Sequence, residues 1–263
     1  MSALKDRLKS GEIVIGTMAV EFNTPNLPRM LQISGFEYMI VDCEHGYFDY
    51  ASVAQMIAVA KGWRMPVIVR IPDTSRTCIL KYMDMGASGL LVPMVSGPED
   101  LQRVVEYAKY RPIGKRGVAL NRTHAGYEVP DAEAYMRQAN DETILLGQIE
   151  TAEGLERVDE ICAVSGIDGM LLGPNDLLQD MQGDGDTLST EVATAHLNGA
   201  ISKLGKAAHR HAICSGIISS DQTLLKTGVE HGMQLLSWSS EVRLMMAQAS
   251  NGLRQLEELR HLH

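Results

Sequence analysis

The stretch PVIVRIPDTSRTCILKYMDMGASGLLVPMV, residues 66–95, shows the repeat that decides the fold. It opens with an apolar run at 66–71, continues with a helix-like segment at 75–85, and closes with a second apolar run at 88–95. Both runs are apolar throughout instead of alternating, which is typical of strands buried on both faces of a parallel sheet. The stretch therefore predicts a parallel strand–helix–strand unit.

The same unit recurs along the whole chain. Six further runs read IVIGTMAV (13–20), YMIVDC (38–43), ILLGQIE (144–150), DGMLLG (168–173), AICSGI (212–217) and MQLLSW (233–238). Segments of helical periodicity lie at 50–61, 98–110, 152–164, 190–210, 221–230 and 240–259. Eight strands alternating with helices over 263 residues predict a single α/β domain, a (β/α)8 TIM barrel spanning 1–263. A doubly wound sheet is the alternative, but it usually carries GxGxxG after its first strand, and this sequence has no such motif.

One region between the fourth and fifth runs breaks the repeat. Residues 111–139 contain RPIGKRGVALNRTHAGYEVP, a long excursion without a strand-like run. Long loops in compact domains are usually functional or lie at interfaces. We therefore expect this excursion to take part in binding or in a subunit contact.

Composition narrows the class of protein. Thirty-three acidic residues against 24 Lys and Arg give a net charge of −9, which disfavours nucleic acid as a partner. No apolar run approaches the roughly 18 residues of a membrane helix, and the charged start MSALKDRLKSGE does not resemble a secretory signal. The four cysteines are scattered without a CxxC pair, and those in apolar runs, Cys43 and Cys214, suit buried thiols. These features predict a reduced, cytoplasmic globular protein.

Polar side chains gather where the apolar runs end, and barrel enzymes carry their catalytic groups at the carboxyl ends of strands. These side chains are Asp42 and His45 after the second run, Arg70 at the end of the third, Gln148 and Glu150 at the end of the fifth, and Asp176 after the sixth. Each has a structural alternative: a carboxylate can cap the next helix, an arginine can form an ion pair, and a histidine can be hydrogen-bonded in the core. Their convergence on one end of the barrel favours a site.

The residue types indicate the chemistry. The carboxylates of Glu150 and Asp176 with the amide of Gln148 suit a hard divalent cation such as Mg²⁺ or Mn²⁺, whereas the sequence has no HxxxH or Cys cluster for zinc. A cation together with Arg70 would bind an α-keto acid and stabilise its enolate, the intermediate of aldol and decarboxylation chemistry. Histidine is the side-chain type best suited to proton transfer near neutral pH, so His45 is the natural general acid/base. A Schiff-base aldolase is disfavoured because every lysine falls in a predicted helix or loop.

Six segments carry a family resemblance. They are GFEYMIVDCEHG (35–46), VIVRIP (67–72), DMGASGLLVPMV (84–95), RPIGKRGV (111–118), GQIET (147–151) and GIDGMLLGPNDLLQDM (166–181). With these segments in family order, the sequence resembles the HpcH/HpaI family of metal-dependent pyruvate aldolases. The resemblance implies a TIM barrel that uses Mg²⁺, Mn²⁺ or Co²⁺ to cleave a 4-hydroxy-2-oxo acid into pyruvate and an aldehyde.

The resemblance also implies roles for individual residues. Glu150 and Asp176 would bind the metal, and Arg70 would lie beside the keto oxygen. The other implied roles are His45 as acid/base held by Asp84, Asp42 beside His45 or the metal's water, Gln148 against pyruvate, and the backbone of Gly173, Pro174 and Asn175 around the pyruvate carboxylate. The family further implies a last helix swapped between subunits of a homohexamer, a dimer of trimers. The stripe of Val242, Met245, Met246, Ala249 and Leu253 would pack there, or else would cover its own barrel.

Some positions depart from the family pattern. GPNDLL stands where GPADLS is usual, so Asn175 and Leu178 replace Ala and Ser. The eighth run continues as LLSWSSE, and the excursion carries an unexpected His124. These changes bear on the aldehyde acceptor and not on the metal ligands. Three alternatives stay open: a 2-oxo diacid decarboxylase, a lyase acting on a CoA thioester, and a non-catalytic barrel that binds a keto acid.

Overall fold

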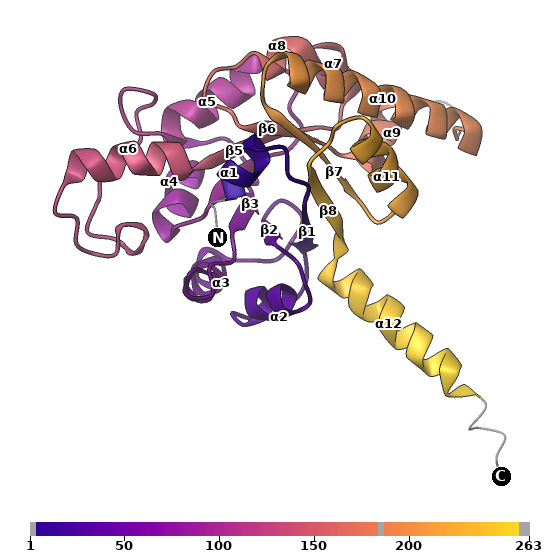
Figure 1. Cartoon of the computed structure of the whole chain (residues 1–263), viewed down its shortest axis with the longest axis horizontal. Helices are drawn as coiled ribbons and strands as arrows, with labels where there is room; N and C mark the ends of the chain where they lie inside the picture. Colours follow the sequence, from indigo (N-terminus) through magenta and orange to yellow (C-terminus); the bar gives the residue numbers. More distant parts are fainter. Residues whose placement is uncertain (1–3, 184–186, 258–263) are drawn as a thin grey trace.

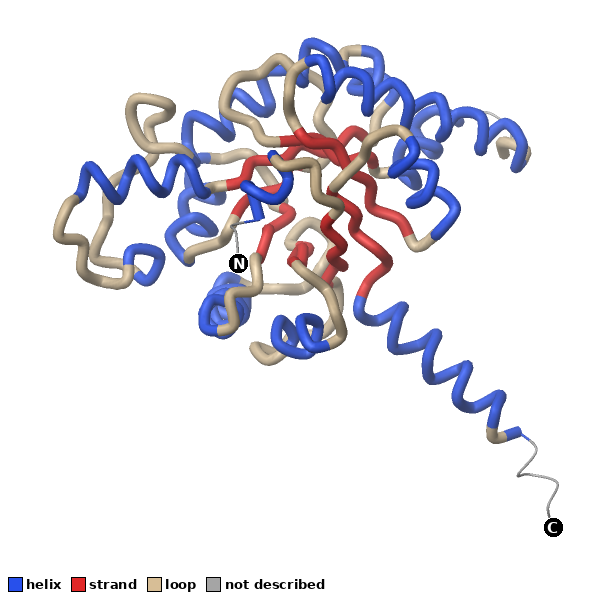
Figure 2. Tube along the Cα trace, viewed as in Figure 1, coloured by secondary structure: helices blue, strands red, loops and turns tan. Residues whose placement is uncertain are grey.

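The computed structural model describes residues 4–183 and 187–257 of the chain, and its eight parallel strands close into a barrel in sequence order. The strands are β1 (Val14–Ala19), β2 (Tyr38–Asp42), β3 (Val67–Arg70), β4 (Gly89–Val92), β5 (Ile144–Ile149), β6 (Gly169–Leu172), β7 (Cys214–Ser219) and β8 (Leu235–Ser240). Figure 1 and Figure 2 show the strands at the centre with helices around them. The predicted TIM barrel is confirmed.

The helices largely follow the predicted segments. They are α1 (Leu4–Lys9), α2 (Leu27–Ile33), α3 (Tyr50–Gly62), α4 (Arg76–Met85), α5 (Pro98–Ala108), α6 (Ala132–Glu142), α7 (Ala152–Glu156), α8 (Val158–Cys162), α9 (Pro174–Gln182), α10 (Thr190–Arg210), α11 (Gln222–Glu230) and α12 (Glu241–Gln255), with a 3-10 turn η1 at Thr123–Ala125. Side-chain caps fix several starts: Asp49 accepts from the N–H of Ser52 before α3, and Ser75 accepts from that of Cys78 before α4.

Helices α1, α2 and α9 lie in segments that the sequence analysis did not assign to a helix. Three further differences concern one predicted helix, the excursion and two strand ends. The segment 152–164 is two short helices, because Arg157 at φ −91° and ψ 11° leaves the helical region between α7 and α8. The excursion contains α6, which buries only Asn140 and so shows no apolar stripe in the sequence. Strands β7 and β8 end in Ser219 and Ser240, beyond the apolar runs that predicted them. Apolar runs therefore located the strands but not their polar ends.

Two apolar clusters hold the barrel together. One fills the barrel interior with side chains such as Ile40, Ile68 and Leu171, and Leu4 and Leu8 of α1 join it. The other lies between the strands and the surrounding helices. Lys5 of α1 pairs with Asp168 at 2.7 Å, just before β6 begins, so α1 packs against the amino end of the barrel. The carboxyl end is left to polar groups.

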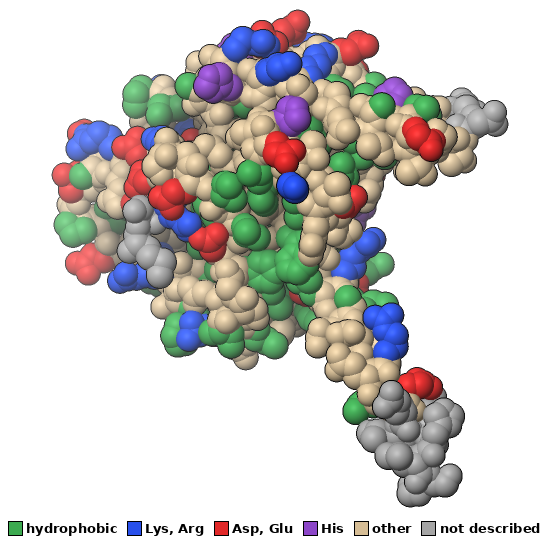
Figure 3. Space-filling model, turned by 45° about the vertical axis from the view of Figure 1, so that its right-hand side comes forward, with side chains coloured by type: hydrophobic (Ala, Val, Ile, Leu, Met, Phe, Trp, Pro, Cys, Tyr) green, Lys and Arg blue, Asp and Glu red, His purple; other side chains and the backbone are tan. Residues whose placement is uncertain are grey.

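Helix α12 leaves its own barrel. Among its residues only Glu241 is buried, while Met245, Met246 and Leu253 are 48%, 58% and 62% exposed. Figure 3 shows the helix standing clear of the rest of the described chain. The apolar stripe predicted at 242–253 therefore does not cover its own barrel.

The four cysteines are all buried free thiols. Within residues 4–183 and 187–257, no helix has both the length and the apolar character to cross a membrane.

Candidate active site

A buried ion pair joins the ends of β2 and β3. Asp42 and Arg70 are partners in the sheet register, so their side chains leave neighbouring strands at the same level. Arg70 donates from Nε to Asp42 Oδ1 at 2.9 Å and from Nη2 to Asp42 Oδ2 at 2.7 Å. The exposed fractions are 2% for Asp42 and 7% for Arg70. This two-pronged contact fixes the guanidinium plane at the carboxyl end of the barrel.

A tight turn after β2 carries Glu44 and His45. The Asp42 carboxylate accepts hydrogen bonds from the N–H groups of Glu44 and His45, at 3.1 and 3.3 Å. A Cβ at Gly46 would lie 2.2 Å from the carbonyl oxygen of Asp42, so only glycine fits there. The His45 ring is 71% exposed, and its Nε2 lies 3.9 Å from Glu44 Oε2. The histidine therefore faces open space at the barrel mouth and is not a core residue.

Glu44 is a further charged side chain at the site, and the sequence reasoning assigned it no role. Its Oε2 lies 3.2 Å from Nη1 of Arg70 and, although buried, has no hydrogen-bond partner among the described residues. Burial raises the pKa of Glu44, and the positive charge of Arg70 offsets part of that rise. Its place between Asp42 and His45 in the DCEHG motif was the available signal.

Gln148 and Glu150 form the second part of the site. Gln148 Nε2 donates to Glu150 Oε2 at 2.5 Å, and the N–H of Met94 donates to Glu150 Oε1 at 2.7 Å. Met94 has a positive φ of 51°, a strained backbone that is often found at functional sites. Burial above all, together with the nearby carboxylates of Glu44 and Asp176, raises the pKa of Glu150 to about 7, against the opposing effects of the hydrogen bond from Met94 and the charge of Arg70. The site thus concentrates negative charge that a cation would stabilise.

The start of α9 closes the site from the side of β6. A Cβ at Gly173 would lie 2.6 Å from both Gln148 Nε2 and Glu150 Oε2, so the backbone passes directly over these groups. Pro174 begins the helix, and Gly173 supplies no capping side chain for its first N–H groups. Asn175 and Asp176 follow in the first turn, and both are exposed. These features suit a small anion and leave the Asp176 carboxylate accessible.

The donor set fits a hard divalent cation with open positions. Glu150 and Asp176 supply carboxylates, and the buried Gln148 Oε1 has no hydrogen-bond partner in the part of the chain that the structure describes. Across the same residues, no three His, Cys, Asp or Glu side chains gather into a metal cluster. Two carboxylates and an amide oxygen would leave several positions for water and substrate, as Mg²⁺ sites commonly do.

Asp84 is not brought to His45 within one chain. It lies at the end of α4, which leads into the amino end of β4, whereas His45 follows the carboxyl end of β2. Its carboxylate accepts from Nη2 of Arg116 at 2.8 Å, and its carbonyl oxygen lies 3.2 Å from Nδ1 of His124. Because α4 runs back along the barrel, the two ends are too far apart for the expected contact.

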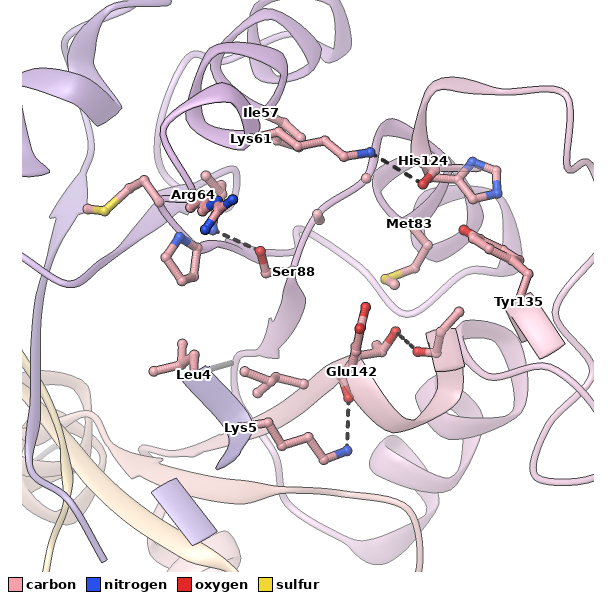
Figure 4. Close-up of a pocket in the computed structure, with 18 of the residues that line it drawn as sticks. Leu4, Lys5, Ile57, Lys61, Arg64, Met83, Ser88, His124, Tyr135 and Glu142 are labelled. Atoms are coloured by element: carbon pink, nitrogen blue, oxygen red, sulfur yellow. Dashed lines mark hydrogen bonds between the residues drawn. The ribbon is translucent and has the colours of Figure 1, made fainter. Parts of the chain in front are cut away.

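A separate cavity of about 420 Å³ opens at the amino end of the barrel. Lys61, Arg64, Ser88, His124 and Glu142 line it, and Figure 4 shows Lys61 hydrogen-bonded to the backbone of His124 there. None of the residues expected to hold metal or substrate lines this cavity. The chemistry-bearing groups lie at the other end, so volume alone does not locate the active site.

The arrangement can bind and polarise a small 2-oxo acid. Arg70 presents a fixed positive charge, the Glu150–Asp176 set suits a cation, and the start of α9 suits a carboxylate. Charge that develops on a substrate oxygen between these groups would be stabilised in a largely buried setting. His45 at the open mouth can exchange protons with the part of the substrate that reaches it.

Comparison with known proteins agrees with this reading. Residues 17–247 match the family model described as HpcH/HpaI aldolase/citrate lyase. The chain is 32% identical over 251 residues to the hydroxypyruvate/pyruvate aldolase of Roseovarius nubinhibens, covering 95% of this chain and 94% of that protein. It is 32% identical over 246 residues to the 4-hydroxy-2-oxo-heptane-1,7-dioate aldolase of Klebsiella pneumoniae, covering 93% and 89%. The crystal structure of an HpcH/HpaI aldolase from Desulfitobacterium hafniense superposes with a TM-score of 0.89 at 31% identity, covering 98% of each chain.

Proposed function

The chain belongs to the HpcH/HpaI aldolase family, and from that premise we propose that it is a divalent-metal-dependent aldolase acting on 4-hydroxy-2-oxo acids. It would cleave such an acid into pyruvate, or a closely related 2-oxo acid, and an aldehyde. The observation that carries the proposal is the buried Arg70 guanidinium fixed by Asp42 beside the Glu150 carboxylate at the carboxyl end of the barrel.

The substrate's oxo-acid end is proposed to lie between β3, β5 and β6. Arg70 would donate to the 2-oxo oxygen, where negative charge develops as the C3–C4 bond breaks. Gln148 and the backbone of Gly173, Pro174 and Asn175 would hold the carboxylate. The close approach of Gly173 to Gln148 supports this, because any side chain at 173 would fill the space. Positioning of this kind supplies much of the rate in enolate chemistry.

We propose that Glu150 and Asp176 hold the cation, which would be Mg²⁺, Mn²⁺ or Co²⁺. The buried carboxylate of Glu150, with its pKa raised to about 7, supports this because a bound cation would stabilise its charged form. When bound, the cation would supply positive charge that polarises the 2-oxo acid. Asp42 would contribute by fixing Arg70 and the turn that carries His45.

His45 is proposed to accept the proton of the C4 hydroxyl during cleavage and to return it in the reverse direction. Its exposed ring at the end of the turn lies where the aldehyde half of the substrate would leave. The second candidate, a 2-oxo diacid decarboxylase, would use the same oxo-acid groups but no proton acceptor at C4. His45→Ala separates the two, because it should stop pyruvate release from 4-hydroxy-2-oxo acids while leaving CO₂ release from 2-oxo diacids intact.

We also propose that the chain acts as a homo-oligomer, a hexamer built as a dimer of trimers. Exposed Met245, Met246 and Leu253 on a helix that leaves its own barrel support it, since apolar helix faces usually pack against a partner. Sedimentation of Met246→Glu against the unmodified protein tests this. A smaller species is expected, and an unchanged mass would argue against α12 as the contact. Four buried free thiols are compatible with a cytoplasmic location, which we propose as well.

A further inference from the structure

A buried carboxylate at the start of α12 has no part in the proposed reaction. Glu241 is only 4% exposed. Its Oε1 accepts hydrogen bonds from the N–H groups of Val20, Glu21 and Phe22 at 2.9, 2.6 and 2.8 Å. Its Oε2 accepts from Val20 at 3.0 Å as well. Among the described residues no Lys, Arg or His forms an ion pair with it. Three successive backbone N–H groups therefore stabilise the negative charge of Glu241, as in an anion-binding nest.

An irregularity between β1 and β8 directs the Glu241 side chain towards the turn at residues 20–22. The register passes from Gly16 opposite Ser237 to Met18 opposite Ser240, so β8 carries an extra residue there. Ser239 lies in the left-handed region at φ 61°, and its carbonyl accepts from the Thr17 hydroxyl at 3.3 Å. Bulges of this kind redirect the residues that follow them. Here the redirection brings the first residue of α12 over the carboxyl end of β1.

The turn at residues 20–22 lies at the mouth of the barrel. It follows the carboxyl end of β1, with Val20 packed on the cluster inside the barrel and Phe22 on the cluster outside it. Next to it, Asn23 Nδ2 donates to the Ser52 hydroxyl at 3.0 Å, on the first turn of α3. The loop that enters α3 is the one that carries His45. The turn thus braces the His45 side of the mouth.

The position of the turn relative to the oxo-acid groups follows from the strand order. In a closed ring of eight strands in sequence order, β1 lies opposite β5, the strand that leads into Glu150. The turn therefore faces the metal side from across the mouth. A substrate whose carboxylate and oxo group lie near Glu150 would extend its other half towards residues 20–22.

We propose that Glu241 is a positioning residue for the aldehyde half of the reaction. It holds residues 20–22 in the conformation that receives the aldehyde. Because Glu241 is the only buried residue of α12, this conformation depends on the position of that helix. The proposal extends the proposed function, since it assumes that an aldehyde is bound there. A side chain of this length is required because its Oε1 must meet three N–H groups at once.

The test compares Glu241→Gln and Glu241→Asp with the unmodified oligomer. Glutamine keeps the shape but removes the negative charge and places an NH₂ where Oε2 accepts from the N–H of Val20. Aspartate keeps the charge but withdraws it by one methylene. Amide hydrogen exchange in peptides spanning residues 17–24 should speed up at least tenfold. In the aldol direction with pyruvate and propanal, the KM for propanal should rise at least tenfold, with the KM for pyruvate within twofold. Glu230→Gln, an exposed residue 4.0 Å from Lys226, is the matched control and should match the unmodified protein in every readout.

A further readout separates this proposal from the proposed function. Exchange of the pyruvate methyl protons with D₂O requires the enolate but no aldehyde, so Glu241→Gln should keep it within twofold. Unchanged amide exchange at 17–24, or methyl exchange that falls as far as the aldol rate, would overturn the positioning role. If the unmodified protein neither exchanges these protons nor cleaves 4-hydroxy-2-oxo acids, the proposed function fails, and amide exchange alone decides whether Glu241 holds the turn.

Discussion

Removing the Arg70 side chain should lower both stability and catalysis, and a second variant can separate the two effects. Arg70 and Asp42 form a two-pronged pair at 2.7 and 2.9 Å, and both are almost fully buried. Arg70→Ala leaves the Asp42 carboxylate buried without its partner, which costs about 3–5 kcal/mol. For a chain of this size that loss lowers the melting temperature by roughly 10 °C.

The double variant Asp42→Asn/Arg70→Met removes both charges together. Asparagine keeps an oxygen for the N–H groups of Glu44 and His45, and methionine keeps most of the volume of the arginine stem. A buried pair replaced by neutral groups of similar size often has near-native stability, so most of the lost stability should return. Activity should stay at least about a hundredfold down, because the donor to the developing oxyanion is gone.

Urea unfolding midpoints and pyruvate release, followed by a coupled lactate dehydrogenase assay, give the two readouts. Asp42→Asn alone is the control, since it unpairs Arg70 but keeps its charge and should lose less activity than Arg70→Ala. Recovery of activity together with stability in the double variant would refute the reasoning, because it would make the pair purely structural.

Three further predictions concern single residues. In the metal-free protein the pKa of Glu150 is raised to about 7 from 4.5, so the folded chain holds a proton that the unfolded chain releases. The free energy of unfolding should therefore fall by about 3 kcal/mol as the pH rises between these values. Urea midpoints measured with chelator should show this fall, and Glu150→Gln should remove it. His45→Ala should reduce cleavage at least about a hundredfold and leave the melting temperature within about 2 °C, because its ring is 71% exposed; a large loss of stability would indicate a structural histidine. Gly173→Ala should weaken metal binding, measured by calorimetry, at least about tenfold, because its Cβ would lie 2.6 Å from Gln148 Nε2 and Glu150 Oε2. An unchanged affinity would show that the metal lies elsewhere.

The sequence predicted the barrel well because its signal is carried by buried strands. Runs such as 66–71 and 144–150 are apolar up to the polar groups near their carboxyl ends, and no other periodic segment competes with them. Helix α6 was not predicted because it buries only Asn140, so its sequence lacks an apolar stripe. The path of α12 was left open as well, because an apolar stripe gives no information on whether the surface it covers is its own barrel or a partner.

For the candidate site, position at strand ends was informative and pairing was not. Asp42, Arg70, Gln148 and Glu150 lie at one end because parallel strands share a direction. That Arg70 binds Asp42 depends on the strand register, which places the two residues side by side. The contact of Asp84 with Arg116 depends on the fold of the excursion, which no local pattern in the sequence indicates.

The most direct test of the account is pyruvate release from a 4-hydroxy-2-oxo acid, measured first with chelator and then with added Mg²⁺, Mn²⁺ or Co²⁺. Asp176→Ala, an exposed position, serves as the matched variant in the same assay. The account predicts release that stops with chelator, returns with metal, and stays absent in Asp176→Ala at every metal concentration. Release that continues in chelator, or that survives in the folded Asp176→Ala protein, would contradict it.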